Sequence, residues 1–428
     1  MSRPLYTLIF ILLLPFVLLR LLIRSRKAPE YRKRWAERFG LFKSPNQASG
    51  VWFHTVSVGE FLAAAPLIEQ VLEAHPDKLI TITTTTPTGS EQVRQRFVDQ
   101  IASGRVFHVY LPYDIPFMLN AFLKRIRPSL LVILETELWP NLIHCSSRSG
   151  CKVLVANARL SEKSARGYAK FEKIAKPMLA QIHHLAVQNS VDGERFIQVG
   201  MPKENMSITG SIKFDVSIDE SSEAFANRFK QRWQGDSASR KVWIMASTHK
   251  GEDEIALAAH EKILSQQPRA LLILVPRHPE RFDSVARLIA EKGFAVGRRS
   301  DEMSVTEKTQ VLLVDSMGEL PGFLAASEIC CMGGTFVENG GHNPLEPAAL
   351  GLPVVMGPSQ FNFAQICDML TEAGGLKTVT ATDELAQQVL AWFADELQRQ
   401  QVGLLAKSVV EANRGAKQKL FQLIEARM

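Results

Sequence analysis

From residue 50 onward, short runs rich in β-branched and other apolar residues alternate with segments whose apolar positions recur at helical spacing. Strands that are apolar throughout are typical of parallel sheets, because crossover helices cover both faces of such a sheet. The alternation therefore predicts an α/β fold with doubly wound sheets. The first set of predicted strands is Val51–Val56, Leu79–Thr84, Val106–Leu111, Leu130–Leu134, Lys152–Asn157, His184–Gln188 and Asn205–Thr209.

The alternation breaks once, at a polar and helix-prone stretch, and then restarts. A chain of 428 residues is too long for one ordinary core, so two domains are expected. We predict an anchor over residues 1–24, a first domain over 25–215, a linker over 216–235 and a second domain over 236–428. The helices after Glu384 are expected to close the second domain, with the last free to pack back on the first. The second set of predicted strands is Val242–Ala246, Ala270–Val275, Gln310–Val314, Glu328–Met332 and Pro353–Met356.

An apolar run over Leu5–Ile23 precedes the alternating region. About 19 residues at a rise of about 1.5 Å each can just cross the core of a bilayer. The residues after the run are strongly basic, whereas only Arg3 and the amino terminus precede it. The positive-inside rule therefore predicts a single-pass anchor with both domains in the cytoplasm. A cleaved signal peptide is the alternative, but it would carry its charges before the run and small residues at a cleavage site.

The sequence lacks several common motifs for nucleotide and metal binding. There is no GxxxxGK[ST] or GxGxxG motif, which disfavours ATPase and dehydrogenase functions, and no DxD or HExxH motif for a metal. The acidic run Glu252–Glu254 is interpreted as an exposed helix start. The five cysteines have no CxxC spacing, which favours free thiols. We expect no metal and no cofactor.

Ligands of open α/β sheets bind beyond the carboxyl ends of the strands, so acidic residues at those positions are candidates for catalysis. Glu60 follows the first strand and lies in the first turn of the next helix. Helix capping alone would explain it, but an ionised carboxylate there is also suited to take a proton from an attacking hydroxyl. Glu135 and Glu137 directly follow the apolar run Leu130–Leu134, where acids are costly to bury unless paired or used. A structural salt bridge is the alternative.

Basic residues occur at two further strand ends. Lys213 lies in the GSIKFD segment at the end of the first half, where it could neutralise a phosphate or a carboxylate, or could be a solvated linker lysine. In the second half Pro276 and Arg277 begin the PRHPER segment, whose prolines predict a rigid loop. Such a loop would hold the Arg277 guanidinium where it could bind a phosphate.

Two glycine-containing segments complete the candidate site of the second half. Met317, Gly318 and Glu319 follow an apolar strand. Downstream, the pairs Gly333–Gly334 and Gly340–Gly341 predict close backbone approach, and GGHNPLEP predicts a helix with its amino terminus at Asn343 and Pro344. The N–H groups of that helix would face an anion, and Glu346 could accept hydrogen bonds from ribose hydroxyls. The residues assigned to this segment of the site are Asn343, Pro344, Leu345 and Glu346.

The motifs, taken together and in order, resemble those of the 3-deoxy-D-manno-octulosonic acid (Kdo) transferases of Gram-negative bacteria, which are GT-B glycosyltransferases. The resemblance covers nearly the whole chain. The matching segments are RKAPEYRKRW, SVGE, TPTGSE, YLPYD, ETELWPNLI, ANARLS, GSIKFD, STHKGEDE, PRHPERF, MGEL and GGHNPLEP.

The resemblance implies transfer of Kdo from CMP-Kdo to the lipid A precursor (lipid IVA) by two Rossmann-like domains on the cytoplasmic side of the inner membrane. By motif matching, Glu60 would be the general base, and Glu135 and Lys213 would assist the transition state. CMP would be held by Pro276, Arg277, Met317, Gly318, Glu319, Asn343, Pro344, Leu345 and Glu346. A GT-B enzyme that uses a UDP-sugar on another membrane lipid, or a catalytically idle scaffold of the same fold, are the alternatives. No nucleic-acid partner is expected.

Overall fold

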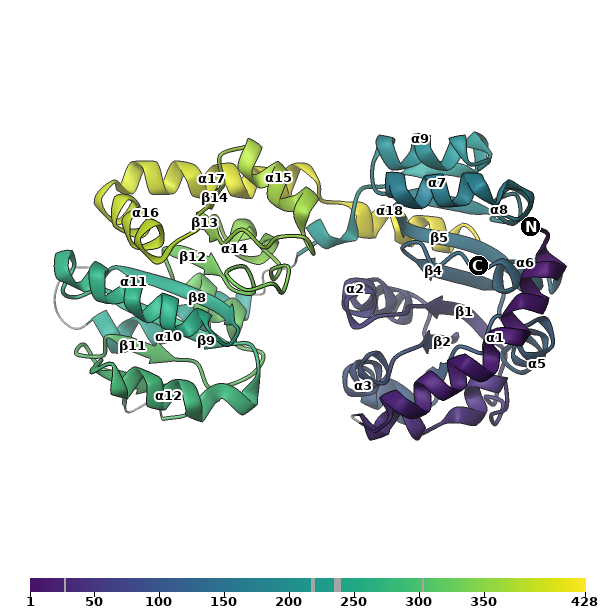
Figure 1. The fold of residues 1–428 in the computed structure, drawn as a ribbon, viewed down its shortest axis with the longest axis horizontal. Helices are drawn as coiled ribbons and strands as arrows, with labels where there is room; N and C mark the ends of the chain where they lie inside the picture. Colours follow the sequence, from purple (N-terminus) through teal and green to yellow (C-terminus); the bar gives the residue numbers. More distant parts are fainter. Residues whose placement is uncertain (27, 217–219, 235–239, 302–303) are drawn as a thin grey trace. The chain divides into compact units, whose positions relative to one another are not determined.

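The computed structural model describes residues 1–428 except 27, 217–219, 235–239 and 302–303. It divides into two compact units (Figure 1): residues 1–215 with 414–428 form unit 1, and residues 216–413 form unit 2. Helix α18 (Ala416–Glu425) therefore belongs to unit 1, which corrects the assignment of residues up to 428 to the second domain. The Asp215 carboxylate holds this helix by accepting hydrogen bonds from the backbone N–H groups of Gly415 and Lys417, at 2.7 and 2.6 Å.

Unit 1 is built on a seven-stranded parallel sheet in the order β3-β2-β1-β4-β5-β6-β7. The apolar runs predict these strands to within two residues at each end. Their bounds are β1 Ser49–His54, β2 Leu79–Thr84, β3 Val106–Tyr110, β4 Leu130–Leu134, β5 Lys152–Ala158, β6 His184–Val187 and β7 Met206–Ile208.

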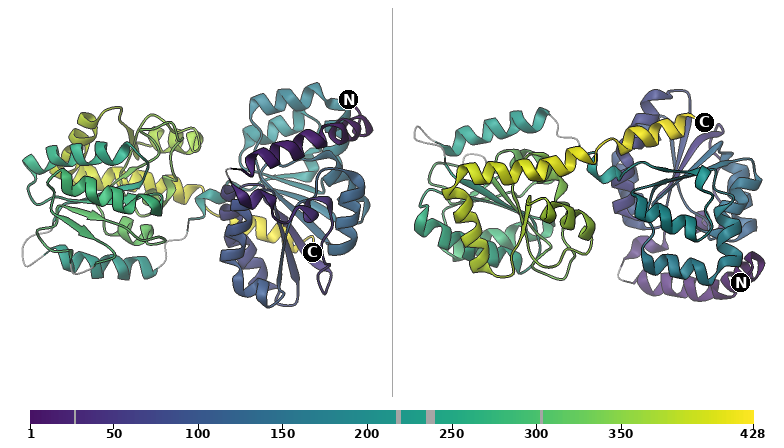
Figure 2. Two further views of the ribbon diagram at one scale, coloured as in Figure 1. Left: turned by 60° about the horizontal axis from the view of Figure 1, so that its bottom comes forward. Right: turned by 90° about the horizontal axis from the view of Figure 1, so that it is seen from above.

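Successive side chains of each strand enter different cores, as the two-residue period of a strand requires. Val51 and Phe53 of β1 pack in a core that includes residues of α2, α3 and α18, whereas Trp52 packs in a core that includes residues of α5, α6 and α8. Helices therefore cover both faces of the sheet (Figure 2). The helices before α18 are α2 Val58–Ala74, α3 Pro87–Arg96, α4 Val98–Ala102, α5 Pro116–Ile126, α6 Pro140–Arg148, α7 Glu162–Lys170, α8 Glu172–Leu179 and α9 Ser190–Gln198.

Unit 2 contains a second seven-stranded parallel sheet, in the order β10-β11-β9-β8-β12-β13-β14. The two edge strands β10 and β14 are absent from the predicted set. The strands are β8 Val242–Thr248, β9 Leu271–Pro276, β10 Val296–Arg298, β11 Val311–Leu313, β12 Ile329–Met332, β13 Val354–Met356 and β14 Leu376–Thr378. The helices that follow β8 are α11 Glu252–Gln266, α12 Phe282–Glu291, α13 Leu320–Ala325, α14 Leu345–Ala349, α15 Ala364–Glu372, α16 Thr382–Ala394 and α17 Glu396–Ala412.

The stretch predicted as a linker, residues 216–235, is corrected in its described part. Residues Glu220–Gln234 form helix α10, which packs on α13 inside unit 2. Phe225, Phe229 and Trp233 recur every four residues, and the rings of Phe225 and Phe229 pack against the ring of Phe323 at 5.0 and 5.3 Å between centroids. Residues 217–219 and 235 lie outside the described residues.

Helix α1 (Arg3–Arg24) is long and apolar enough to cross a membrane, with a mean hydropathy of 2.5 over its best window. One side of it packs on unit 1, where Phe10, Leu14, Val17, Leu18 and Leu21 contact a buried cluster of Tyr113, Ile115 and Met118. Figure 1 shows it lying along unit 1 beside α5 and α6. The opposite side of α1 is exposed and apolar; the side chains most exposed there are Leu8, Leu12, Leu13, Phe16, Leu19 and Ile23.

The strand order reverses between β1 and β4 in unit 1, and between β8 and β12 in unit 2. Loops leaving the sheet at such a reversal diverge to opposite faces and leave room for a ligand at the carboxyl ends of the strands. The segments after β1 and β4 contain Glu60 and Glu135, and the segments after β8 and β12 contain the STHKGEDE motif and the first glycine pair. Each unit thus has one expected binding position.

Candidate active site

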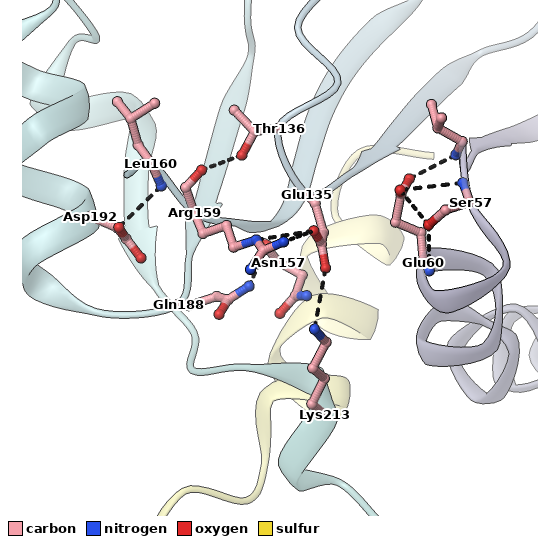
Figure 3. A network of polar contacts seen from close by, with 11 residues as sticks. Ser57, Glu60, Glu135, Thr136, Asn157, Arg159, Leu160, Gln188, Asp192 and Lys213 are labelled. Atoms are coloured by element: carbon pink, nitrogen blue, oxygen red, sulfur yellow. Dashed lines mark hydrogen bonds and ion pairs between the residues drawn. The ribbon is translucent and has the colours of Figure 1, made fainter. Parts of the chain in front are cut away.

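Glu60 closes the amino terminus of α2 through a capping box. Its Oε2 accepts a hydrogen bond from the Val56 N–H at 2.7 Å, and its Oε1 accepts bonds from the N–H and the hydroxyl of Ser57 at 3.3 and 2.7 Å (Figure 3). Burial raises the pKa of Glu60 above its ordinary value, these hydrogen bonds lower it, and the Glu137 and Glu135 carboxylates raise it further. The capping function that the sequence left open is therefore real, and it fixes the orientation of this carboxylate.

Glu135 lies between two cations at the end of β4 (Figure 3). Its Oε2 accepts a hydrogen bond from Arg159 Nε at 3.1 Å, and its Oε1 lies 3.7 Å from Lys213 Nζ. The structure therefore brings Glu135 and Lys213 together, and the structural salt bridge considered from the sequence is present. Glu135 has a φ of +56°, a left-handed conformation that is uncommon for residues other than glycine and is concentrated at functional sites.

Asn157, at the end of β5, organises the turn that carries Lys213. Its Oδ1 accepts a hydrogen bond from the Ile212 N–H at 3.1 Å, and its backbone carbonyl accepts one from Gln188 Nε2 at 2.9 Å. Its φ is also +56°. Asn157 and Arg159 belong to the ANARLS segment, yet the sequence analysis assigned no site residue there. The signal was available, because Asn157 and Arg159 lie at the carboxyl end of the apolar strand β5, just as Glu135 follows β4.

In unit 2 the loops after β8 and β12 are joined by one buried carboxylate. Glu252 is fully buried, and it accepts hydrogen bonds from the N–H groups of His249, Gly334, Thr335 and Phe336 at 2.8, 2.7, 2.9 and 3.0 Å. The interpretation of Glu252–Glu254 as an exposed helix start was wrong for its first two residues. Asp253 is also buried and pairs with Arg281 and with the Thr248 hydroxyl.

The glycine pairs have a reason within the protein itself. A Cβ on Gly333 would lie 2.6 Å from the Ser247 carbonyl oxygen, so only glycine lets the β12 loop pass the end of β8. Gly340 has a φ of +83°, and a Cβ there would lie 2.5 Å from the Phe361 ring. The close approach that the glycine pairs predict is therefore present at Gly333 and Gly340, and the approaching groups belong to the chain itself.

The charge of Arg277 influences two nearby titratable groups of unit 2, His342 and Glu346. A second histidine, His249, contacts His342. Burial, together with the nearby charge of Arg277, lowers the pKa of His342 to about 4. Burial raises the pKa of Glu346, and this rise is partly offset by the hydrogen bond from Asn343 and by the charge of Arg277. His249 Nε2 lies 2.8 Å from His342 Nε2, with the two rings stacked. The sequence analysis did not assign these histidines to the site, although STHKGEDE and GGHNPLEP contain them.

The Arg277 side chain is exposed, while its backbone N–H donates to the Thr248 carbonyl at 3.0 Å. The Pro276 ring is buried at the end of β9. The loop that the two prolines define thus presents an arginine at the carboxyl end of β9. Within the described residues, no hydrogen bond of the Arg277 guanidinium is found, which leaves its fork free to bind an anion.

The remaining assigned residues occupy two short segments. Met317 is about half exposed, Gly318 has a φ of +86°, and Glu319 binds Arg299 through two hydrogen bonds of 2.9 and 2.6 Å. Helix α14 begins at Leu345 and has only five residues, with Pro344 as its N-cap, which corrects the expected cap at Asn343. Asn343 Oδ1 instead accepts a hydrogen bond from the Leu345 N–H at 3.1 Å. So short a helix offers little dipole to an anion.

Over the residues that the structure describes, no group of three or more His, Cys, Asp or Glu side chains is arranged to hold a metal ion. All five cysteines are buried free thiols.

Two doubly wound units, each with charged groups at the reversal point of its sheet, form the architecture of a GT-B glycosyltransferase. A solved glycosyltransferase from Rickettsia africae shares this fold with a TM-score of 0.54; it covers 89% of this chain and 99% of its own, at 10% identity.

The family model for 3-deoxy-D-manno-octulosonic-acid transferase matches residues 33–216. A 3-deoxy-D-manno-octulosonic acid transferase from Haemophilus influenzae is 42% identical over 99% of this chain and 98% of its own length. One from Bordetella pertussis is 33% identical over 99% of both chains. The chain belongs to the family of 3-deoxy-D-manno-octulosonic acid transferases, glycosyltransferases of lipopolysaccharide synthesis.

Proposed function

We propose that the chain transfers Kdo from CMP-Kdo to a sugar hydroxyl of the lipid A precursor (lipid IVA), with inversion at the anomeric carbon and without a metal ion. The observation that carries the proposal is the geometry of Glu60. Its carboxylate is held by three hydrogen bonds at the carboxyl end of β1, next to the sheet reversal. Family membership supplies the transferred sugar.

Glu60 would act as the general base. A carboxylate has about four acceptor positions, two on each oxygen. Val56 and Ser57 occupy both positions on Oε1 and one on Oε2, so one position on Oε2 remains for the hydroxyl of the acceptor. Burial raises the pKa of the Glu60 carboxylate, and a carboxylate with a raised pKa is a stronger base than an exposed one. As the hydroxyl oxygen bonds to the anomeric carbon, Glu60 takes its proton, and the bond from that carbon to the CMP phosphate breaks.

Lys213 and Arg159 would stabilise the negative charge that develops on the phosphate leaving group as its bond to the anomeric carbon breaks. Both contact Glu135, so the three groups carry a net positive charge beside the base. Positively charged groups held in place by ion pairs need little reorganisation when negative charge develops. Glu135 would act as the group that orients the two cations.

Unit 2 would hold CMP through Pro276, Arg277, Met317 to Glu319 and Asn343 to Glu346. Arg277 presents an exposed guanidinium for the phosphate, and Glu346 can accept from ribose hydroxyls. Because the leaving group has one phosphodiester rather than a diphosphate, arginine and lysine can neutralise it without a divalent ion.

The enzyme would act at the cytoplasmic face of the inner membrane, to which α1 would attach it. The basic residues after α1 would contact anionic headgroups, each worth about 1 kcal/mol near the surface. The single-pass crossing expected from the sequence remains a prediction.

The direct test incubates purified protein with an acylated glucosamine disaccharide phosphate and CMP-Kdo, followed by mass spectrometry of the lipid. We expect a mass gain of one or more Kdo residues, unchanged by EDTA. Parallel reactions with UDP-sugars test the competing donor class. A product formed only with a UDP-sugar, or only with added divalent ion, would refute the corresponding part of the proposal.

A further inference from the structure

Unit 1 contains an apolar cavity between the first half of α1, the loop before α6, and helices α7 and α8. Its volume is about 400 Å³. Aromatic and aliphatic side chains make up the wall, among them Tyr6, Phe10, Trp139, Tyr168, Phe171 and Ile174. Neither a carboxylate nor a cationic side chain lines it in the part of the chain that the structure describes.

The α1 wall of this cavity is fastened to unit 1 by polar contacts. The Tyr6 hydroxyl donates to the buried Asp114 carboxylate at 2.9 Å, and an Arg3 guanidinium nitrogen donates to Asn141 Oδ1 at 3.1 Å. Asp114 also accepts bonds from the N–H groups of Asn141 and Leu142, at 3.1 and 2.7 Å. One carboxylate therefore fixes both α1 and the start of α6, which border the cavity.

Two polar atoms of the cavity wall are hydrogen-bonded to carboxylates of the protein. The Tyr6 hydroxyl binds Asp114, and Trp139 Nε1 donates to Glu137 Oε2 at 2.8 Å. Apart from Met1, which carries the amino terminus, and the Tyr168 hydroxyl, the lining is hydrocarbon and aromatic ring, which suits an apolar ligand. A volume of 400 Å³ is at the lower end of ligand pockets, which run from about 300 to 1,000 Å³.

Two features connect the cavity with lipid and with the reaction. The helix that forms one wall exposes a continuous apolar face on its other side, which includes Leu12 at 63% and Phe16 at 69% exposure. Trp139, in another wall, follows Glu135 by four residues, so the two α-carbons are at most about 14 Å apart. An apolar group in the cavity would thus lie close both to α1 and to the loop after β4, which contains Glu135.

We propose that this cavity binds one acyl chain of the lipid acceptor and thereby positions the acceptor sugar at the loop after β4. The inference rests on the proposed function, since it requires an acylated acceptor. It assigns to α1 a part in substrate binding, in addition to membrane attachment. It also requires α1 to lie against unit 1 during the reaction, as it does in the structure, and not to cross the membrane as the sequence predicts.

The test compares two cavity variants with one control in the full-length protein. Phe171→Asp places a charge in the wall at a position that is already 48% exposed, so the fold should tolerate it. Ile174→Trp fills the cavity from α8. Val191→Asp puts the same charge on the exposed surface of α9, away from the cavity lining.

Transfer of Kdo from CMP-Kdo is measured with a tetra-acylated disaccharide phosphate and with the same disaccharide after complete deacylation. We expect both cavity variants to raise KM for the acylated acceptor by about 10-fold or more, which corresponds to about 1.4 kcal/mol. KM for CMP-Kdo and turnover of the deacylated acceptor should equal those of the wild type, and Val191→Asp should change nothing.

Three outcomes would overturn the proposal in distinguishable ways. If the wild type is active but Phe171→Asp keeps its KM for the acylated acceptor, the cavity does not bind an acyl chain, although the proposed function stands. If Phe171→Asp reduces activity equally on both acceptors, its effect is structural and the cavity has no role in acyl binding. If the wild type transfers Kdo to neither acceptor, the proposed function fails and this inference fails with it.

Discussion

Replacing Glu252 by Gln tests whether unit 2 depends on one buried carboxylate. Each oxygen of Glu252 accepts two backbone hydrogen bonds: Oε2 from His249 and Gly334, and Oε1 from Thr335 and Phe336. A glutamine keeps one oxygen but presents an NH2 group to the other two N–H donors, so two bonds are lost. Hydrogen bonds to a charged group contribute about 1.5–3 kcal/mol each, so we expect a loss of about 3–6 kcal/mol.

The chain offers a matched control for this substitution. Glu254 lies two residues further on in α11 and is exposed, so Glu254→Gln should leave stability nearly unchanged. For a domain of about 200 residues, each kcal/mol shifts Tm by about 2–4 °C. Scanning calorimetry should therefore show a transition of Glu252→Gln lowered by about 6–24 °C, and calorimetric titration should show weakened CMP binding. A transition that coincides with that of Glu254→Gln would refute the argument that this carboxylate joins the two loops.

Three further predictions follow from the site and from α1. Because burial, and to a smaller extent the Glu137 carboxylate, raises the pKa of Glu60, the acid limb of kcat/KM should lie above the ordinary pKa of a glutamate. Glu137→Gln should move this limb to lower pH, and an unmoved limb would exclude the contribution of Glu137. Arg277→Ala should weaken CMP binding by about 10- to 100-fold, the loss expected for a hydrogen bond to a charged group, whereas Arg287→Ala on the exposed side of α12 should not. If α1 lies along the cytoplasmic face of the membrane, a cysteine introduced by Ser2→Cys should react with an impermeant maleimide in inside-out vesicles, which expose that face. Reaction only in right-side-out preparations, which expose the opposite face, would show that α1 crosses the membrane.

The strands of both sheets could be predicted because they are continuous apolar runs, which buried parallel strands require. The edge strands β10 and β14 were not predicted; each has three residues and includes exposed or polar positions such as Arg298 and Lys377. The edge strand β7 has the same length and was predicted, so shortness alone does not explain the difference. The stretch that contains α10 was predicted to be helix-prone, as the structure confirms, but it was assigned to a linker. The four-residue spacing of Phe225, Phe229 and Trp233 already indicates a helix that buries one face.

The positions of Glu60 and Glu135 could be predicted, because each lies in the segment that follows an apolar strand; their catalytic roles stay predictions. The candidate site was not predictable where partners are remote in sequence. From the sequence Glu252 was expected to be an exposed acid, because the backbone N–H groups of Gly334 and Thr335 that bind its carboxylate lie more than 80 residues away. Likewise, the contact of α1 with Asp114 joins residues 108 positions apart, so the sequence showed an apolar helix but not its docking on unit 1.

The proposed mechanism requires Glu60 as the general base, and a comparison of Glu60→Gln with Ser57→Ala tests this directly. Glutamine can still serve as the third residue of a capping box, so Glu60→Gln should fold and bind CMP normally. Removal of a general base should lower kcat about 10²- to 10⁴-fold. Ser57→Ala removes the cap hydroxyl, at a cost of about 1 kcal/mol, and one of the three hydrogen bonds to the Glu60 carboxylate, but it keeps the base, so it should lower kcat far less than Glu60→Gln does. If Glu60→Gln transferred Kdo at the wild-type rate, Glu60 would be a helix cap alone and the proposed mechanism would be wrong.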